Sequence, residues 1–295
     1  MKIKEIFNVK QPVLSFEIFP PKRDGDLQTI YKTIDSLAKL SPDYISVTYG
    51  AAGSERSNTT LDIAAHIKNE YSIESLAHLT CVSSSKDEVD RIFDSFEEAG
   101  IENILALRGD LPENLQNSER AFKYASDLIQ YMKETRNFSI GAACYPEGHI
   151  EAKSRTVDLI NLKHKADQGV DFLVTQLFFD NDRFYDFRNE VRALDIHVPI
   201  TVGIMPVLNK NQIERMVALS GASLPEKFKK IMSKYEFKPQ ALHDAGIIYA
   251  SEQLIDLLSN GVDGVHLYVM NKPEVAKQLV DNVGNVLKAL RNEQK

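Results

Sequence analysis

The sequence predicts an α/β fold in which one domain, residues 1–295, forms a (β/α)8 TIM barrel. Short apolar runs alternate with helix-like stretches along the chain, a pattern typical of parallel strands joined by helices. About eight such units can be counted, and 295 residues suit one barrel of the usual ~250-residue size. A doubly wound open sheet is the alternative, because periodicity does not distinguish a closed sheet from an open one.

The expected strands are short runs rich in Val, Ile, Leu and Phe. They lie near residues 13–19, 43–48, 75–81, 103–107, 138–144, 171–178, 198–204 and 263–268. Most of these strands end in polar or ionisable residues that could act in catalysis or binding. Because the carboxyl ends of barrel strands meet at one mouth, these residues are expected to form a single site.

The expected helices follow the strands. They lie near residues 27–40, 59–69, 86–99, 118–135, 152–168, 181–194, 209–219, 240–260 and 273–290, with a short helix at 225–234 in an irregular insertion. Ser84 and Ser85 offer N-cap hydroxyls, and Gly100, Gly169 and Gly261 stand where helices should stop.

Bulk composition narrows the function classes. A formal net charge of −7 argues against a nucleic-acid partner, which usually needs a basic face. No segment is typical of a signal peptide or a membrane span, so a cytoplasmic protein is expected. Cys81 and Cys144 are expected to be buried, reduced thiols. The seven histidines show no helical zinc spacing, so no metal site is expected.

Glu17 and Asp110 are the candidate catalytic carboxylates. Glu17 lies between Phe16 and Ile18, and a carboxylate in apolar surroundings should have a raised pKa, which suits a general acid. An ion-paired lumen residue is the alternative. Asp110 follows Arg108 and Gly109 after a strand, where a loop ion pair is the alternative. His78 and His149 lie at strand ends and could contact a ligand, whereas the other histidines look structural or exposed.

Two further groups of residues indicate ligand binding. The helix at 152–168 is locally basic, and Asp158, Asn161 and Lys165 would line one of its faces; that face is either solvated or a phosphate clamp. Gln176 beside Phe178 and Phe179 suits an aromatic heterocycle, although paired Phe residues are more often core. No Gly-x-Gly-x-x-Gly motif or P-loop is present.

Together, eight motifs resemble the bacterial type of the methylenetetrahydrofolate reductase family. They span about Ser15 to Lys272 in order. The motifs are Ser15-Phe16-Glu17-Ile18-Phe19-Pro20-Pro21-Lys22, Ser46-Val47-Thr48-Tyr49-Gly50-Ala51, His78-Leu79-Thr80-Cys81, Ala106-Leu107-Arg108-Gly109-Asp110-Leu111-Pro112, Tyr145-Pro146-Glu147-Gly148-His149, Thr175-Gln176-Leu177-Phe178-Phe179-Asp180, Gly203-Ile204-Met205-Pro206-Val207 and His266-Leu267-Tyr268-Val269-Met270-Asn271-Lys272.

The resemblance implies a barrel that binds FAD non-covalently. The implied flavin contacts are Thr48, Tyr49, Ala51, His78, Arg108, Gly109, Asp110, Ala125, Tyr145, His149, Ala152, Asp158, Asn161, His164 and Lys165. Gln176 would serve both NAD(P)H and folate, with Gln212 and Lys272 on the folate side and Met216 as an apolar cap. Lys165 would be the pyrophosphate partner.

The implied chemistry is a ping-pong hydride relay that feeds methyl groups to methionine synthesis. Reduced nicotinamide, expected to be NADH rather than NADPH, reduces the flavin, and 5,10-methylenetetrahydrofolate is then reduced to 5-methyltetrahydrofolate. Glu17 would protonate the departing ring nitrogen, and Asp110 would tune the flavin and orient folate. A homo-oligomer is also implied by the resemblance.

Three positions depart from the family pattern. Lys272 and His164 stand where relatives have Arg, and Met216 stands where Phe is common. Two alternative functions remain: a related FAD-barrel dehydrogenase such as proline dehydrogenase, and a non-catalytic flavin- or folate-binding protein. Folate-dependent reoxidation of reduced flavin would separate the leading hypothesis from both.

Overall fold

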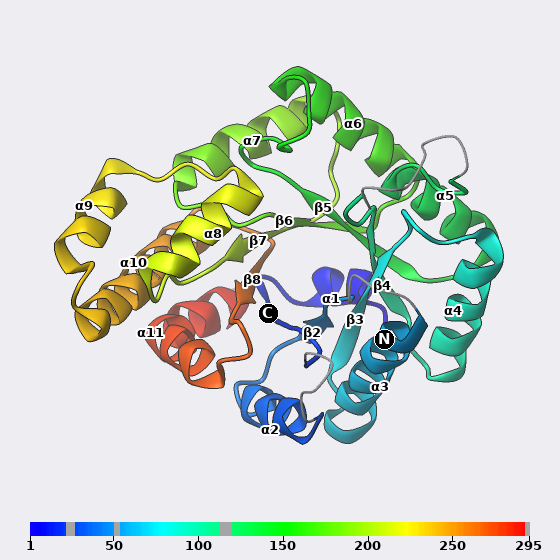
Figure 1. Ribbon diagram of the computed structural model, residues 1–295, viewed down its shortest axis with the longest axis horizontal. Helices are drawn as coiled ribbons and strands as arrows, with labels where there is room; N and C mark the ends of the chain where they lie inside the picture. The colour runs from blue at the N-terminus through cyan, green and yellow to red at the C-terminus, as the bar shows by residue number, and fades with distance from the viewer. Residues whose placement is uncertain (22–26, 50–53, 112–119, 293–295) are drawn as a thin grey trace.

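Parallel strands form a closed barrel that is ringed by helices (Figure 1). This computed structural model describes residues 1–21, 27–49, 54–111 and 120–292, and no side chain within 54–58 is described. The strands are β1 Val13–Ile18, β2 Tyr44–Val47, β3 Glu74–Thr80, β4 Asn103–Leu107, β5 Ser139–Cys144, β6 Phe172–Thr175, β7 Ile200–Ile204 and β8 Gly264–Tyr268. Each pairs in parallel with the next, and β8 closes on β1. The predicted barrel is confirmed, and the open sheet is excluded.

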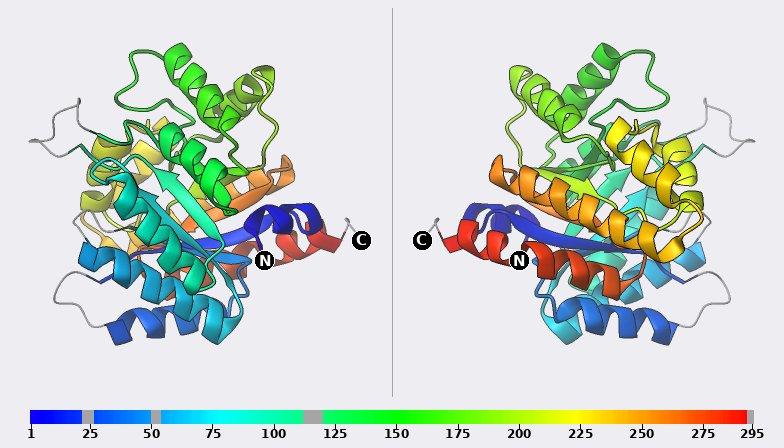
Figure 2. Two further views of the ribbon diagram at one scale, coloured as in Figure 1. Left: turned by 90° about the vertical axis from the view of Figure 1, so that its right-hand side faces the viewer. Right: turned by 90° about the vertical axis from the view of Figure 1, so that its left-hand side faces the viewer.

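The helices alternate with these strands. They are α1 Ile3–Val9, α2 Leu27–Ala38, α3 Ser54–Tyr71, α4 Lys86–Glu98, α5 Ala125–Thr135, α6 Arg155–Asp167, α7 Asn181–Ala193, α8 Lys210–Ser220, α9 Glu226–Tyr235, α10 Pro239–Ser259 and α11 Pro273–Asn292. The short helix expected at 225–234 corresponds to α9. Helices α1 and α11 lie on the same side of the barrel in the side views (Figure 2).

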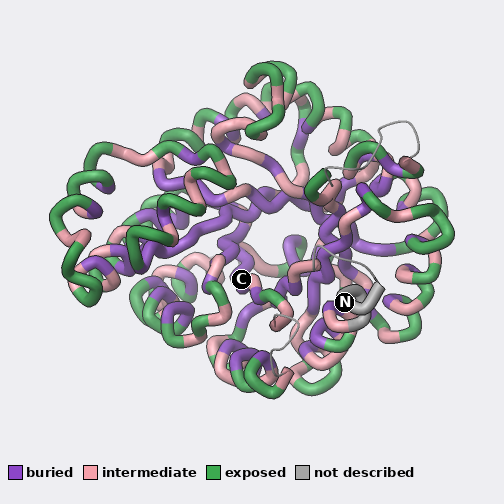
Figure 3. Tube along the Cα trace, in the orientation of Figure 1, coloured by how far each residue is buried: buried purple, intermediate pink, exposed green. Residues whose placement is uncertain are grey.

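The main core lies between the strands and the outer helices. Along β1, Leu14, Phe16 and Ile18 are buried in this layer, whereas Ser15 and Glu17 alternate with them and face the lumen. Burial is therefore greatest along the strands, and the outer helix surfaces are exposed (Figure 3). Free Cys81 and Cys144 are both buried, as expected.

Helix α1 is a feature that the sequence analysis missed. Its Ile3, Ile6 and Phe7 pack with Val13 and Phe172 in a second apolar cluster, separate from the main core. The backbone amide of Ile3 donates to Asn103 Oδ1 (2.7 Å), which ties α1 to the first residue of β4. The apolar plug therefore lies at the amino-terminal ends of the strands and leaves the opposite mouth for polar residues.

Two strand and helix boundaries bear on the candidate site. β6 ends at Thr175 rather than continuing to 178, so Gln176 is the first residue beyond the strand. The helix expected at 118–135 begins at Ala125, with Tyr124 in extended conformation at its N-cap. Gln176 and Tyr124 therefore stand where a strand or helix meets a loop.

Candidate active site at the barrel mouth

The closure of the barrel determines the position of Glu17. In the β1–β8 register, Ser15 is paired with His266 and Glu17 with Tyr268. The side chain of Glu17 retains 22% of its exposure, which leaves it largely desolvated but still accessible. A carboxylate in this position can contact a ligand at the mouth while most of its surface faces protein.

Two histidines contact the same oxygen of Glu17. Its Oε2 lies 3.6 Å from His78 Nε2, which comes from β3, and 3.6 Å from His266 Nε2, which comes from β8. Both imidazoles are buried. His266 Nδ1 lies 2.7 Å from Ser15 Oγ, so the cluster extends along the lumen face of β1.

These contacts reverse the expected shift of the Glu17 carboxyl. Burial does raise the pKa of Glu17, but its interactions with His266 and His78 outweigh burial, so the pKa is lowered. The sequence expectation of a raised pKa was wrong, because it counted the apolar neighbours in the chain and not the histidines across the barrel. Burial also lowers the pKa of His78 to about 4, so that His78 is neutral at pH 7.

Three of the expected flavin contacts lie directly after β2 or within β3. Thr48 and Tyr49 follow β2 directly and are half-buried, and His78 lies within β3. None of the described residues donates a hydrogen bond to His78 Nε2 or accepts one from it. Ala51 lies outside the described residues.

The loop after β4 carries Arg108, Gly109 and Asp110. Arg108 makes two hydrogen bonds with Glu151, from Nη1 (2.6 Å) and Nη2 (2.8 Å). Gly109 has φ +86°, and a Cβ there would lie 3.0 Å from Thr80 Cβ, so a residue without a side chain fits best. Asp110 is exposed. The ion pair of this loop is therefore Arg108–Glu151, not the pair between Arg108 and Asp110 that was weighed as the alternative.

The loop after β5 is ordered by its own contacts. The rings of Tyr145 and His149 meet edge to face with centroids 4.6 Å apart. His149 Nδ1 accepts from the Glu151 amide (3.1 Å), and the His149 carbonyl accepts from the Ala152 amide (2.9 Å). Burial raises the pKa of Tyr145 to about 12, so its hydroxyl stays protonated at neutral pH.

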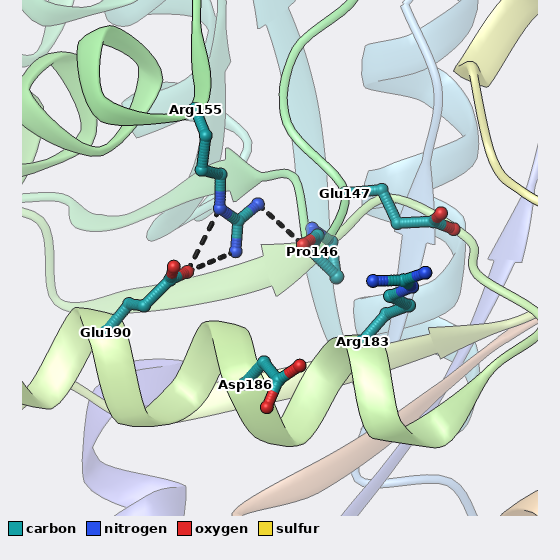
Figure 4. Close-up of a pocket in the computed structure, with 6 residues that line it drawn as sticks. All are labelled: Pro146, Glu147, Arg155, Arg183, Asp186 and Glu190. Carbon is teal, nitrogen blue, oxygen red and sulfur yellow. Dashed lines mark hydrogen bonds and ion pairs between the residues drawn. The ribbon is translucent and has the colours of Figure 1, made fainter.

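Arg155, the first residue of α6, fastens this loop from outside. Its Nη1 donates to the carbonyls of Pro146 (2.6 Å) and Tyr145 (3.3 Å), and its Nη2 donates to Glu190 (2.5 Å). A charged cavity of about 280 Å³ lies here, lined by Pro146, Glu147, Arg155, Arg183, Asp186 and Glu190 (Figure 4). Because Arg155 binds Glu190 and two loop carbonyls, we interpret the charged residues around this cavity as structural, holding the loop after β5 in place.

The polar residues of helix α6 differ in their burial and contacts. Lys165 Nζ donates to the Ala143 carbonyl of β5 (2.5 Å), and burial lowers the pKa of its ammonium. Asp158 is half-buried, whereas Asn161 and His164 are exposed. Ala125, the first residue of α5, is half-buried.

The expected substrate contacts lie after β6, on α8 and after β8. Gln176 Oε1 accepts from the Leu177 amide (2.9 Å). Gln212 bridges the chain before its helix, accepting from the Leu208 amide (3.0 Å) and donating to the Pro206 carbonyl (3.3 Å). Met216 packs in the apolar cluster that contains Phe179. Lys272 is exposed.

Ser15, His266, Tyr268 and Glu151 were missed as parts of the site. The sequence could have indicated Ser15, because residues two apart on a strand share a face and Glu17 was already a candidate. No sequence pattern indicated His266, because its pairing with Ser15 depends on the register between the first and last strands.

Comparison with known proteins identifies the family. The sequence profile described as methylenetetrahydrofolate reductase matches residues 2–284. The chain belongs to the methylenetetrahydrofolate reductase family. Its relatives include the 5,10-methylenetetrahydrofolate reductases of Pectobacterium carotovorum and Escherichia coli, each 36% identical over 271 residues, which is 92% of this chain and 90% of the relative. The Arabidopsis thaliana NADH enzyme is 34% identical over 297 residues, but only 50% of its length is covered.

The fold also has a counterpart among solved structures. A Clostridium thermocellum protein, described as binding two copies of 5-methyl-5,6,7,8-tetrahydrofolic acid, superposes with a TM-score of 0.69 at 13% identity, over 97% of this chain and 99% of its own. At this identity the likeness supports the fold alone.

The described residues contain neither a membrane-spanning helix nor a cluster of metal ligands. No helix in this part of the chain combines the length and the apolar character that a bilayer crossing needs. No three His, Cys, Asp or Glu side chains in the same residues are grouped so that they could hold a metal ion.

Proposed function

We propose that the chain reduces 5,10-methylenetetrahydrofolate to 5-methyltetrahydrofolate with electrons from NAD(P)H, NADH being the expected donor, and that it uses bound FAD. The observation that carries the proposal is the position of Glu17. It is a largely desolvated carboxylate at the barrel mouth, in contact with two histidines, in a chain of the methylenetetrahydrofolate reductase family. Family membership supports the reaction, and the geometry supports an acid at its centre.

Two features of the mouth fit a flavin. His78 Nε2 is buried and lacks a hydrogen bond among the described residues. Lys165 directs a cation toward β5. Thr48, Tyr49, His78, Arg108, Gly109, Tyr145, His149 and Lys165 would hold the cofactor.

When bound, FAD supplies the hydride chemistry that amino-acid side chains lack. The chain itself supplies position and protons. The ring that bridges the folate one-carbon unit must open, and a C–N bond breaks as the departing nitrogen takes a proton. In this proposal Glu17 donates that proton from the mouth, and Gln176, which stands just beyond β6, hydrogen-bonds a polar ring edge.

The anaerobic visible spectrum of the purified protein tests the proposal. The flavin absorption should bleach with NADH and return when methylenetetrahydrofolate is added. A flavin that bleaches but is not reoxidised by the folate would favour another FAD barrel, such as a proline dehydrogenase. A protein that cannot take up FAD would overturn the proposal.

A further inference from the structure

Glu147, in the loop after β5, binds the chain that follows α8. Both of its carboxylate oxygens accept from the backbone amide of Ser223, at 3.0 and 3.1 Å. Ser223 lies just beyond the C-terminal end of α8 and 76 positions from Glu147 along the chain. Figure 4 shows the Glu147 side chain on the opposite side of the cavity from Glu190, directed away from it. The carboxylate therefore joins two segments that are distant in the sequence.

The amides that follow α8 differ in what they bind. Gly221 donates to the Val217 carbonyl (2.9 Å), which is a bond within the end of the helix. Ala222 donates to Ser220 Oγ (3.1 Å), which is again local. The Ser223 amide instead donates to a carboxylate of another loop, and hydrogen bonds to charged acceptors are among the stronger ones in proteins. The C-terminal end of α8 is thus tied by this bond to the loop after β5.

The loop that carries Glu147 also carries two expected flavin contacts, Tyr145 and His149. Their rings meet edge to face, with Glu147 between them in the chain. Arg155 donates to the carbonyls of Tyr145 and Pro146 and so holds the loop from outside. A ligand that binds Tyr145 and His149 would therefore also restrict the movement of Glu147.

Helix α8 carries two expected substrate contacts, Gln212 and Met216. At its N-terminal end the helix is capped by Asn209, whose Oδ1 accepts from the Gln212 amide (2.9 Å). Met216 lies near the other end, where its carbonyl accepts from Ser220 Oγ (2.7 Å). The helix therefore has its own cap at one end and depends on Glu147 at the other.

We propose that Glu147 is a positioning residue that holds the C-terminal end of α8 against the loop after β5, and that this loop sets where Gln212 and Met216 meet the folate. The inference rests on the proposed function and deepens it. Coupling between two sites needs an element whose arrangement both sites influence. The loop is such an element, because Tyr145 and His149 would contact the flavin while Glu147 holds the substrate helix. Cofactor binding should therefore stabilise the end of α8.

Hydrogen exchange of the FAD-free and the FAD-loaded protein tests the tie without any reaction. In the wild type we expect the Ser223 amide to exchange about tenfold more slowly, or slower still, when FAD is bound. E147A should lose this protection, whereas E147Q keeps an oxygen that can accept the bond and should retain it. Protection by FAD that is equal in E147A and wild type, or absent from the wild type, would overturn the proposal.

Kinetics at saturating FAD test the consequence for the substrate. In E147A the concentration of methylenetetrahydrofolate that gives half the maximal rate of flavin reoxidation should rise about 5- to 20-fold, with the maximal rate within about twofold of wild type. S223P removes the donating N–H and should show the same rise, and adding E147A to it should have no further effect. S223A keeps that N–H and is the matched control.

A role confined to holding the loop would give a different result. E147A would then bind FAD more weakly, and its dependence on folate would match wild type once FAD is saturating; this outcome would overturn the inference. If E147A does not fold, S223P carries both tests, because it leaves the loop after β5 unchanged. A wild type whose flavin is never reoxidised by folate would instead contradict the proposed function, and the exchange rates would still decide whether Glu147 ties α8 to the loop.

Discussion

Glu17 and His78, from β1 and β3, meet at the barrel mouth with Oε2 and Nε2 3.6 Å apart. The contact joins a group proposed to donate a proton with a group proposed to touch the flavin. No hydrogen bond joins the two side chains, because His78 Nε2 has no hydrogen-bond partner among the described residues. Because the two side chains touch and each affects the pKa of the other, changes at the two positions are expected to be coupled.

Replacing Glu17 by Gln removes the proton but nearly preserves the shape. We expect the NADH half-reaction to stay within twofold, and the folate half-reaction to fall by about 10²–10⁴, the usual contribution of a general acid. Anaerobic stopped-flow absorbance of the flavin measures both. E252Q, at an exposed carboxylate that pairs with Lys227, is the control. Equal losses in both half-reactions would make Glu17 a structural residue.

Lys165→Ala should weaken FAD retention. A charge-assisted hydrogen bond contributes about 1.5–3 kcal/mol, so the dissociation constant of FAD should rise about tenfold or more, with activity largely restored by added FAD. K163A removes a lysine from the same helix that pairs with Asp167 at the surface, and it should keep wild-type affinity. Fluorescence of released FAD measures both variants. An unchanged affinity in K165A would remove Lys165 from the phosphate site.

His78 should make the protein less stable in acid. Its pKa falls from 6.5 to about 4 on folding, so between these values the unfolded chain binds a proton that the folded chain does not. The free energy of unfolding should therefore decrease as pH drops through this window, by about 3 kcal/mol in total. Urea unfolding of the FAD-free protein at pH 7, 5.5 and 4 measures it. H78N should flatten the curve, whereas H197Q should not; equal slopes in H78N and wild type would refute the burial effect.

Gly203→Ala should destabilise the barrel. A Cβ at this position would lie 2.5 Å from the Thr175 carbonyl oxygen and 2.5 Å from the Tyr268 ring. The ring has little freedom to yield, because its hydroxyl donates to the same carbonyl (2.7 Å). We expect a loss of about 1–3 kcal/mol, the usual cost of overpacking.

Gly284→Ala on α11 is the matched control for that change. A Cβ there has no described atom within 4 Å, so the helix should gain about 0.5–1 kcal/mol. Thermal unfolding compares the two variants. A G203A protein as stable as wild type would show that the close approach at Tyr268 can relax.

The sequence by itself determined the fold class and supplied the candidates for the site, which stay predictions. Alternating strand and helix patterns predicted the barrel, and strand-end positions indicated Glu17, His78 and the Arg108–Asp110 loop. These signals are local, since strand period, helix caps and motifs can be recognised within short windows. The plug helix α1 was missed although Ile3, Ile6 and Phe7 have helical spacing, because a seven-residue helix gives too short a pattern.

Only the tertiary structure decided the electrostatics of the mouth. Ser15 and His266 are 251 positions apart, and the register of β1 on β8 makes them neighbours. Arg108 and Glu151 meet across 43 positions in the same way. The direction of the Glu17 pKa shift depends on groups brought together by closure of the barrel. Apolar periodicity specifies which residues form strands, but a pKa depends on the distances between charges, and those distances exist only in the folded chain.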